Sequence, residues 1–201
     1  MSWLFGRSSL SGQLVVIPAT VSWGGISLNP VSTFTAIDNI FDEGAAEIVD
    51  FDPRTKRMFI VNGAADEFDP PKPGGIDVVD ISDINNPTFL FSIDISPYGS
   101  PNSVAVNPNW FRDEIAVAVE APTKTDNGSV VFFDTDGNFI KQVEAGALPD
   151  MVTYDALGFR VLTANEGEPN DDYSIDPEGS ITLIYNFFGA KYIRPWHVKQ
   201  I

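Results

Sequence analysis

The stretch AEIVDFDP at residues 46–53, followed by RMFIVN at 57–62 and GIDVVD at 75–80, sets a pattern that the chain repeats. Two further copies follow at intervals of about 50 residues. Each copy has an alternating segment ending in a turn dipeptide, a segment rich in β-branched residues, and an apolar segment that begins with glycine. The second copy reads PNSVAVNP (101–108), EIAVA (114–118) and GSVVFFD (128–134), and the third reads PDMVTYD (149–155), RVLTAN (160–165) and GSITLI (179–184).

Short strands that repeat at this period are typical of β-propeller blades. We therefore predict an all-β fold, a partial β-propeller of about three four-stranded blades. Fourth strands are expected at 88–93 and 139–143. The third strands are apolar at nearly every position, which predicts burial on both faces. Closed propellers have roughly four to eight blades, so three blades leave two sheet faces bare and favour self-association.

The chain divides into three parts by composition. Residues 1–35 form a lead-in rich in serine and glycine, 36–184 carry the blades, and 185–201 form a divergent basic tail. The blade repeats are expected at about 46–95, 101–144 and 149–184. The tail lacks acidic residues, which indicates either a truncated or frame-shifted reading of a longer protein or a basic segment that packs on the acidic body.

Charge and composition exclude several classes of function. The chain has 28 acidic and 12 basic residues and a formal net charge of -16, so it repels phosphate backbones and nucleic acid is not an expected partner. It has no cysteine, which excludes disulfides and thiolate metal sites. No apolar run approaches the roughly 20 residues that a membrane-spanning helix needs. The N-terminus carries no clear signal peptide.

Two longer motifs point to a family. FDEGAAEIV at 41–49, and ALPDMV at 147–152 followed by LTANEGEPNDDY at 162–173, resemble the choice-of-anchor I domain family. The resemblance extends from about residue 34 to residue 184 and leaves out the tail. It implies a secreted or cell-surface bacterial β-propeller, attached through varied C-terminal anchors. It also implies kinship with phytase-like and esterase-like propellers and with atypical alkaline phosphatases.

Clustered oxygen ligands make calcium the expected ion, because calcium takes six to eight oxygens from carboxylates, carbonyls and water. The first candidate cluster lies in the acidic segment of the third repeat, where a solvated loop is the alternative reading. The second lies around the start of the first repeat, where carboxylates could line a central channel or cap a turn. The candidate ligands are Asn165, Glu166, Glu168, Asp171 and Asp172 in the first cluster, and Asp42, Glu43 and Glu47 in the second.

Catalytic residues cannot be assigned from the sequence. The chain lacks a Gly-x-Ser-x-Gly nucleophile motif, and its single histidine, His197, lies in the tail. Zinc sites are built mainly from cysteine and histidine, and a chain with one histidine and no cysteine offers little basis for one.

The sequence therefore favours a non-catalytic extracellular or cell-surface propeller module with an adhesion or scaffold role, stabilised by calcium. Its expected partner is an unidentified surface or protein. Two alternatives stay open at this point. One is a calcium-dependent phosphoesterase of the phytase or alkaline phosphatase kind. The other is a subunit of a larger extracellular assembly in which neighbouring copies cover the bare blade faces.

Overall fold

A computed structural model of the chain describes residues 21–23, 26–28, 30–35, 46–63, 74–186 and 196–197. Strands and the turns between them account for the secondary structure of these residues. Within these ranges, no helix is long and apolar enough to cross a membrane.

Three antiparallel sheets of four strands form the body, and strands that are consecutive in sequence are neighbours in each sheet. This confirms the predicted all-β fold with about three four-stranded blades. A separate hairpin pairs β1 (Val21–Trp23) with β2 (Ile26–Leu28). Blade one contains β3 (Val49–Asp52), β4 (Arg57–Asn62), β5 (Gly75–Asp80) and β6 (Thr88–Asp94); blade two contains β7 (Ser100–Val106), β8 (Ile115–Glu120), β9 (Asn127–Phe133) and β10 (Phe139–Ala147); blade three contains β11 (Pro149–Tyr154), β12 (Arg160–Asn165), β13 (Ser180–Tyr185) and β14 (Trp196–His197).

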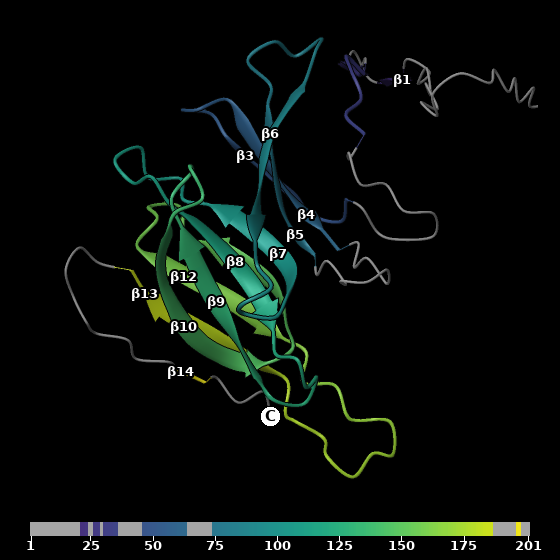
Figure 1. Cartoon of the computed structure of the whole chain (residues 1–201), viewed down its shortest axis with the longest axis vertical. Coiled ribbons are helices and arrows are strands. Elements are labelled where there is room, and N and C mark those ends of the chain that lie inside the picture. The colour runs from purple at the N-terminus through teal and green to yellow at the C-terminus, as the bar shows by residue number, and fades with distance from the viewer. Residues whose placement is uncertain are drawn as a thin grey trace, which may run out of the picture.

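The first strands of the blades lie side by side, as the inner strands of a propeller do. Strand β7 packs against both β3 and β11, and blade two therefore lies between the other two blades (Figure 1). Each later strand of a blade lies further from this shared inner edge, because each sheet is an up-and-down meander. The arrangement brings the turn after each first strand to one end of the molecule.

Apolar side chains fill both spaces between the blades. Alternate residues of a strand point to opposite faces, so β8 sends Ile115 and Val117 toward blade one and Ala116 and Ala118 toward blade three. Strand β9 divides in the same way, with Val131 facing blade one. The predicted two-sided burial of the third strand is confirmed in β5, whose residues Ile76–Val79 are all buried, and in β9, whose residues Val130–Phe133 are all buried.

In the described part of the chain, the outer blades are less completely covered than blade two, although β5 of blade one is buried from Ile76 to Val79. In blade one, Val49 and Phe51 of β3 are exposed, and in blade three Met151 of β11 and Ile181 of β13 are exposed. Strand β13 accordingly alternates between buried and less buried positions. Self-association through exposed blade faces stays a prediction.

Connections between strands follow the local sequence. The Asp134–Asn138 segment closes a tight hairpin in which the Asp134 amide N–H donates to the Asn138 carbonyl (2.9 Å), and Gly137 supplies a φ of 85°. The acidic segment 166–179 is a long connection without strands, and it extends away from the sheets (Figure 1). In the predicted tail, Trp196 pairs with Leu183, so the tail contributes a short fourth strand to blade three.

Replacing Phe132 by alanine tests the packing between blades two and three. The ring is fully buried, so truncation should reduce the free energy of unfolding by about 4 kcal/mol. Phe111→Ala is the matched control, because Phe111 is 88% exposed, and its loss should stay below about 0.5 kcal/mol. Urea unfolding followed by circular dichroism measures both values. Equal losses in the two variants would contradict this account of the core.

Candidate functional site

A pocket of about 410 Å³ opens where the turns after the three first strands meet. Blade one contributes residues 50–54, blade two contributes 105–108 and Trp110, and blade three contributes 153–156. These segments hold the turn dipeptides Asp52-Pro53, Asn107-Pro108 and Asp155-Ala156, which occupy equivalent places in the three repeats. The repeat itself therefore builds the pocket.

An Asp or Asn side chain organises each of the three turns. The Asp52 carboxylate accepts the Arg54 amide N–H (2.9 Å), the Asn107 side-chain oxygen accepts the Asn109 amide N–H (2.9 Å), and the Asp155 carboxylate accepts the Phe159 amide N–H (2.8 Å). Side chains of this length mimic a backbone turn when they accept an amide proton from a residue further along the chain. The same local chemistry thus fixes all three rims of the pocket.

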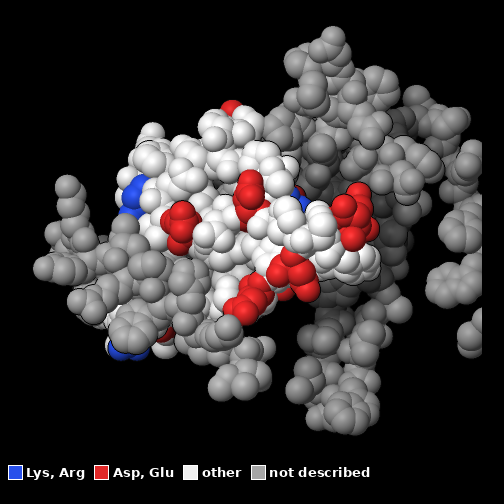
Figure 2. All heavy atoms as spheres, turned by 90° about the horizontal axis from the view of Figure 1, so that it is seen from below, with Lys and Arg blue, Asp and Glu red and all other residues white. Residues whose placement is uncertain are grey.

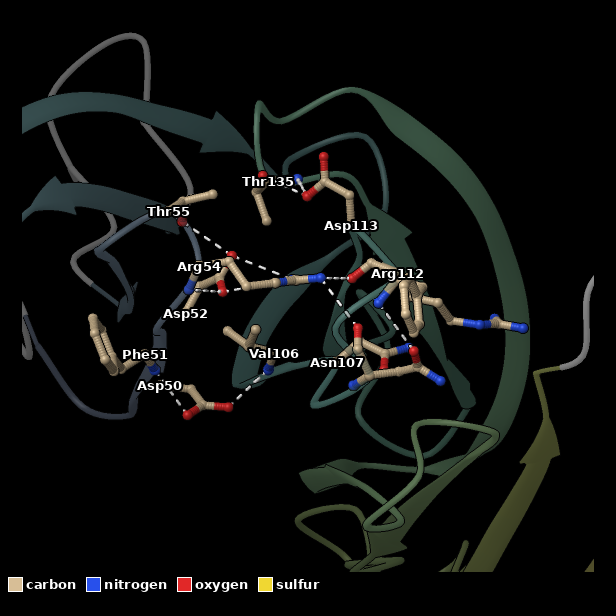
Figure 3. A network of polar contacts seen from close by, with 12 residues as sticks. Asp50, Phe51, Asp52, Arg54, Thr55, Val106, Asn107, Arg112, Asp113 and Thr135 are labelled. Carbon is tan, nitrogen blue, oxygen red and sulfur yellow. Dashed lines mark hydrogen bonds and ion pairs between the residues drawn. The ribbon is translucent and has the colours of Figure 1, made fainter.

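Arg54 joins the turn of blade one to the loop of blade two (Figure 3). Its guanidinium pairs with the fully buried Asp52, with Nε 2.9 Å from Oδ1. Its Nη1 donates to the Asn109 carbonyl (3.2 Å) and to the Arg112 carbonyl. The hydroxyl of Thr55 also donates to Asp52 (3.0 Å), so the carboxylate is fully engaged. A guanidinium can do this because it presents five donors in a fixed plane.

Further contacts cross between the blades at the same end. The second oxygen of Asp50 accepts the Val106 amide N–H (2.7 Å), which ties β3 to β7 (Figure 3). The Asn107 amide group donates to the Gly158 carbonyl (3.2 Å), which ties blade two to blade three. Gly158 has a φ of 70°, and a Cβ there would lie 1.9 Å from the Asn107 side-chain oxygen, so only glycine fits this approach.

A buried polar cluster lies behind the pocket between blades two and three. One carboxylate oxygen of Glu114 accepts from the Tyr154 hydroxyl (3.0 Å), from the Asn107 amide group (3.2 Å) and from the Asn186 amide group. The ammonium of Lys141 lies 4.0 Å from the other Glu114 oxygen and 4.3 Å from the centre of the Phe132 ring. The free-energy cost of removing these groups from water is offset by the hydrogen bonds between them.

Three pKa values in this region depart from the ordinary range. Burial, together with the nearby Glu114 carboxylate, raises the pKa of Tyr154 well above its usual value, so the phenol remains a hydrogen-bond donor. Burial lowers the pKa of Lys141 although Glu114 opposes the shift. Burial disfavours ionisation of Asp52, but hydrogen bonds from Arg54 and Thr55 outweigh it and lower the pKa of that carboxyl.

The predicted calcium ligands are spread over different environments. Asn165 is buried, and its amide group donates to the Thr182 hydroxyl (2.9 Å), whereas Glu168 pairs with Lys124 and Asp172 accepts the Ser174 hydroxyl (2.6 Å). Glu166 and Asp171 are exposed on the same connection, and Glu47 is exposed beside β3. In the described part of the chain, no three Asp, Glu or His side chains form a group that could hold a metal ion. Asp42 and Glu43 lie outside the described residues. The calcium site therefore stays a prediction.

Sequence reasoning did not single out the residues that line and support the pocket. It treated Asp52, Asn107 and Asp155 as turn formers and gave no role to Arg54 or Trp110. A signal was nevertheless present, since an Asx residue recurs at the same place in all three repeats. Equivalent positions of a propeller converge at one end of the molecule, and aligning the repeats would have identified the rim.

Comparison with known proteins agrees with the propeller arrangement of the sheets. The sequence profile of the choice-of-anchor I domain matches residues 47–191. Comparison with curated proteins gives no match. Among similar solved structures, hydrazine synthase from Kuenenia stuttgartiensis has 17% sequence identity and a TM-score of 0.56, and the match covers 75% of this chain and 41% of that one. A eukaryotic initiation factor has 18% identity and a TM-score of 0.50, with 83% of this chain and 36% of that one covered. A proposed 6-phosphogluconolactonase from Bacteroides uniformis has 17% identity and a TM-score of 0.53, with 79% of this chain and 45% of that one covered.

At these identities the likeness concerns the fold alone. The chain spans less than half the length of each of the three matched structures. What it shares with them is the propeller arrangement of sheets.

Arg54→Ala tests the link between blades one and two. Removal of the guanidinium leaves the Asp52 carboxylate buried without its ion-pair partner, and should reduce the free energy of unfolding by about 3 kcal/mol. The matched control is Arg160→Ala, because the Arg160–Asp155 pair is longer (3.5 Å) and Arg160 is largely exposed; its cost should stay below about 1 kcal/mol. Similar losses of unfolding free energy for Arg54→Ala and Arg160→Ala, measured by urea unfolding, would show that Arg54 has no special role in linking the two blades.

The lowered pKa of Asp52 predicts a pH dependence of stability. A carboxyl whose pKa is lower in the folded state stabilises the fold above its unfolded pKa of about 4, and loses that contribution as the pH falls through the folded value. The gap in unfolding free energy between the wild type and Asp52→Asn should therefore narrow as the pH falls below about 4. Exposed Asp176→Asn serves as the control. If the difference in unfolding free energy between the wild type and Asp52→Asn stayed constant down to acid unfolding, the lowered pKa of Asp52 would be refuted.

Proposed function

Because the chain belongs to the choice-of-anchor I domain family, we propose that it is a non-catalytic β-propeller module that acts in adhesion or as a scaffold at the cell surface or outside the cell. The family resemblance supplies the expected location. The propeller arrangement supplies a rigid frame that presents loops and a pocket at the ends of its blades.

One observation carries the non-catalytic reading: Asp50, Asp52 and Arg54, which line the pocket, take part in contacts within and between the blades. Asp52 is buried and paired with Arg54, and Asp50 accepts a backbone N–H from the neighbouring blade. A general acid or base must exchange a proton with a bound substrate, which requires a reachable group with a pKa near the working pH. The pKa of Asp52 is instead lowered, and its oxygens already accept donors from Arg54 and Thr55.

The acidic surface is consistent with a protein that remains dispersed in solution. The face shown in Figure 2 carries more acidic than basic side chains, spread out rather than gathered into one cluster. A high net charge of one sign favours solubility and disfavours phosphate-rich partners. A phosphoesterase would instead need cationic groups that hold the substrate phosphate, and Arg54 at the pocket is already occupied by Asp52 and two carbonyls.

A role within a larger assembly is the second candidate, favoured by the exposed faces of the outer blades. Val49 on blade one and Met151 on blade three are more than half exposed, at positions where an apolar side chain would be covered in a middle blade. Contact with a neighbouring copy or with another protein would remove this surface from water.

We expect the protein to adhere without hydrolysing phosphate esters. Protease treatment of intact cells of the source organism should remove it, and beads coated with the purified protein should attach to those cells more than beads coated with heat-denatured protein. Hydrolysis of p-nitrophenyl phosphate with added calcium should not exceed that of a Glu43→Ala, Glu166→Ala double variant. Turnover that this variant abolishes would establish the phosphoesterase instead. Protection from protease in intact cells, or equal attachment of both kinds of beads, would contradict the surface role.

A further inference from the structure

Trp110 stands at the rim of the pocket and is 67% exposed. Its loop is held from both neighbouring blades: Arg54 of blade one donates to the Asn109 carbonyl, and the Asn109 amide group donates to the Leu157 carbonyl of blade three (3.0 Å). Within the loop, the Asn109 side chain accepts the Phe111 amide N–H (3.1 Å). The loop is therefore ordered before any ligand arrives, which reduces the entropy lost on binding.

An exposed tryptophan on an ordered loop provides a flat apolar surface beside a pocket whose lining is both polar and apolar. Large aromatic rings are highly buried on average, and exposure of one at the mouth of a pocket favours a role in recognition. The electron-rich face of the indole attracts weakly positive C–H groups. The pocket volume of about 410 Å³ lies within the range of small-molecule sites, about 300–1,000 Å³.

The polar lining of the pocket offers more acceptors than donors. Each ionised carboxylate has about four lone-pair positions, and Asp50 uses one on each oxygen for the amide N–H groups of Phe51 and Val106. Asp155 accepts two amide N–H groups on one oxygen and faces Arg160 with the other. The donors of Arg54 are directed to Asp52 and to backbone carbonyls. A complementary ligand must therefore donate hydrogen bonds.

The charges of the pocket are largely balanced within the protein. Arg54 neutralises Asp52, and Arg160 lies 3.5 Å from Asp155, which leaves Asp50 as the carboxylate without a cation partner in the ion pairs described. Acceptor-rich surroundings repel phosphate and carboxylate ligands. The internal pairing also reduces the attraction for a cation. A neutral ligand that is rich in hydroxyl groups fits both conditions.

We propose that this pocket binds one neutral sugar unit of a saccharide, with Trp110 stacked against its apolar face. A pyranose ring has C–H groups on one face and hydroxyl groups around its edge. The C–H face would lie on the indole, and the hydroxyl groups would donate to Asp50 and Asp155, which both line the pocket. The inference rests on the proposed adhesion role, and it names the chemistry that the module recognises.

Titration of the whole protein with maltose, cellobiose, diacetylchitobiose and lactose tests the proposal, with calorimetry as the readout. Glucose 6-phosphate and N-acetyl-lysine amide serve as the anionic and cationic probes. At least one neutral disaccharide should bind more tightly than both charged probes. Trp110→Ala should weaken that binding by about tenfold or more, and Trp110→Phe should retain part of it. Phe111→Ala is the matched control, because Phe111 is the adjacent exposed aromatic and does not line the pocket.

Three results would overturn the sugar site: no binding of any neutral disaccharide at about 10 mM, a concentration that detects even weak sites; equal binding by the Trp110→Ala variant; or a preference for a charged probe. Circular dichroism checks that each variant is folded. Beads that adhere to cells although no sugar binds would reject this inference and leave the proposed function standing. Sugar binding without adhesion of the beads would support the sugar site and reject the proposed adhesion role.

Discussion

Apolar contact between radially adjacent sheets is the interaction on which the molecule depends. A four-stranded sheet alone cannot bury its faces, and stacking against a neighbouring blade covers them. Blade two achieves this fully: its β8 and β9 side chains fill one interface with blade one and another with blade three. The outer blades each have one such interface. Every polar feature at the strand ends is positioned by this stacking.

The polar contacts at the pocket end set the alignment of the blades and add to their cohesion. Asp50, Arg54 and Asn107 each reach a backbone group of the next blade. Their contribution is directional, since hydrogen bonds require particular distances and angles whereas apolar contact does not. The Glu114 cluster adds a second set of directional contacts between blades two and three. Together these contacts fix how the three turns face one another, and hence the shape of the pocket.

The fold could be predicted from the sequence because strand period, turn dipeptides and repeat length all agree. The pocket could not, because its key contacts join residues far apart in sequence. Arg54 donates hydrogen bonds to the carbonyl groups of Asn109 and Arg112, and nothing in the local sequence predicts a hydrogen bond to a main-chain oxygen. In the acidic segment, residues that are close in sequence have different surroundings: Asn165 is buried in the sheet, whereas Glu168 pairs with Lys124.

The two faces of blade two carry different mixtures of side chains. Valine, isoleucine and Phe133 occupy the side toward blade one, whereas the side toward blade three combines four alanines with larger residues such as Phe132. Tyr154 and Ile184 of blade three belong to this second cluster, so the two interfaces are different pairs of surfaces. The repeats resemble one another in sequence but are not interchangeable, and the order of the blades around the axis is encoded in steric fit.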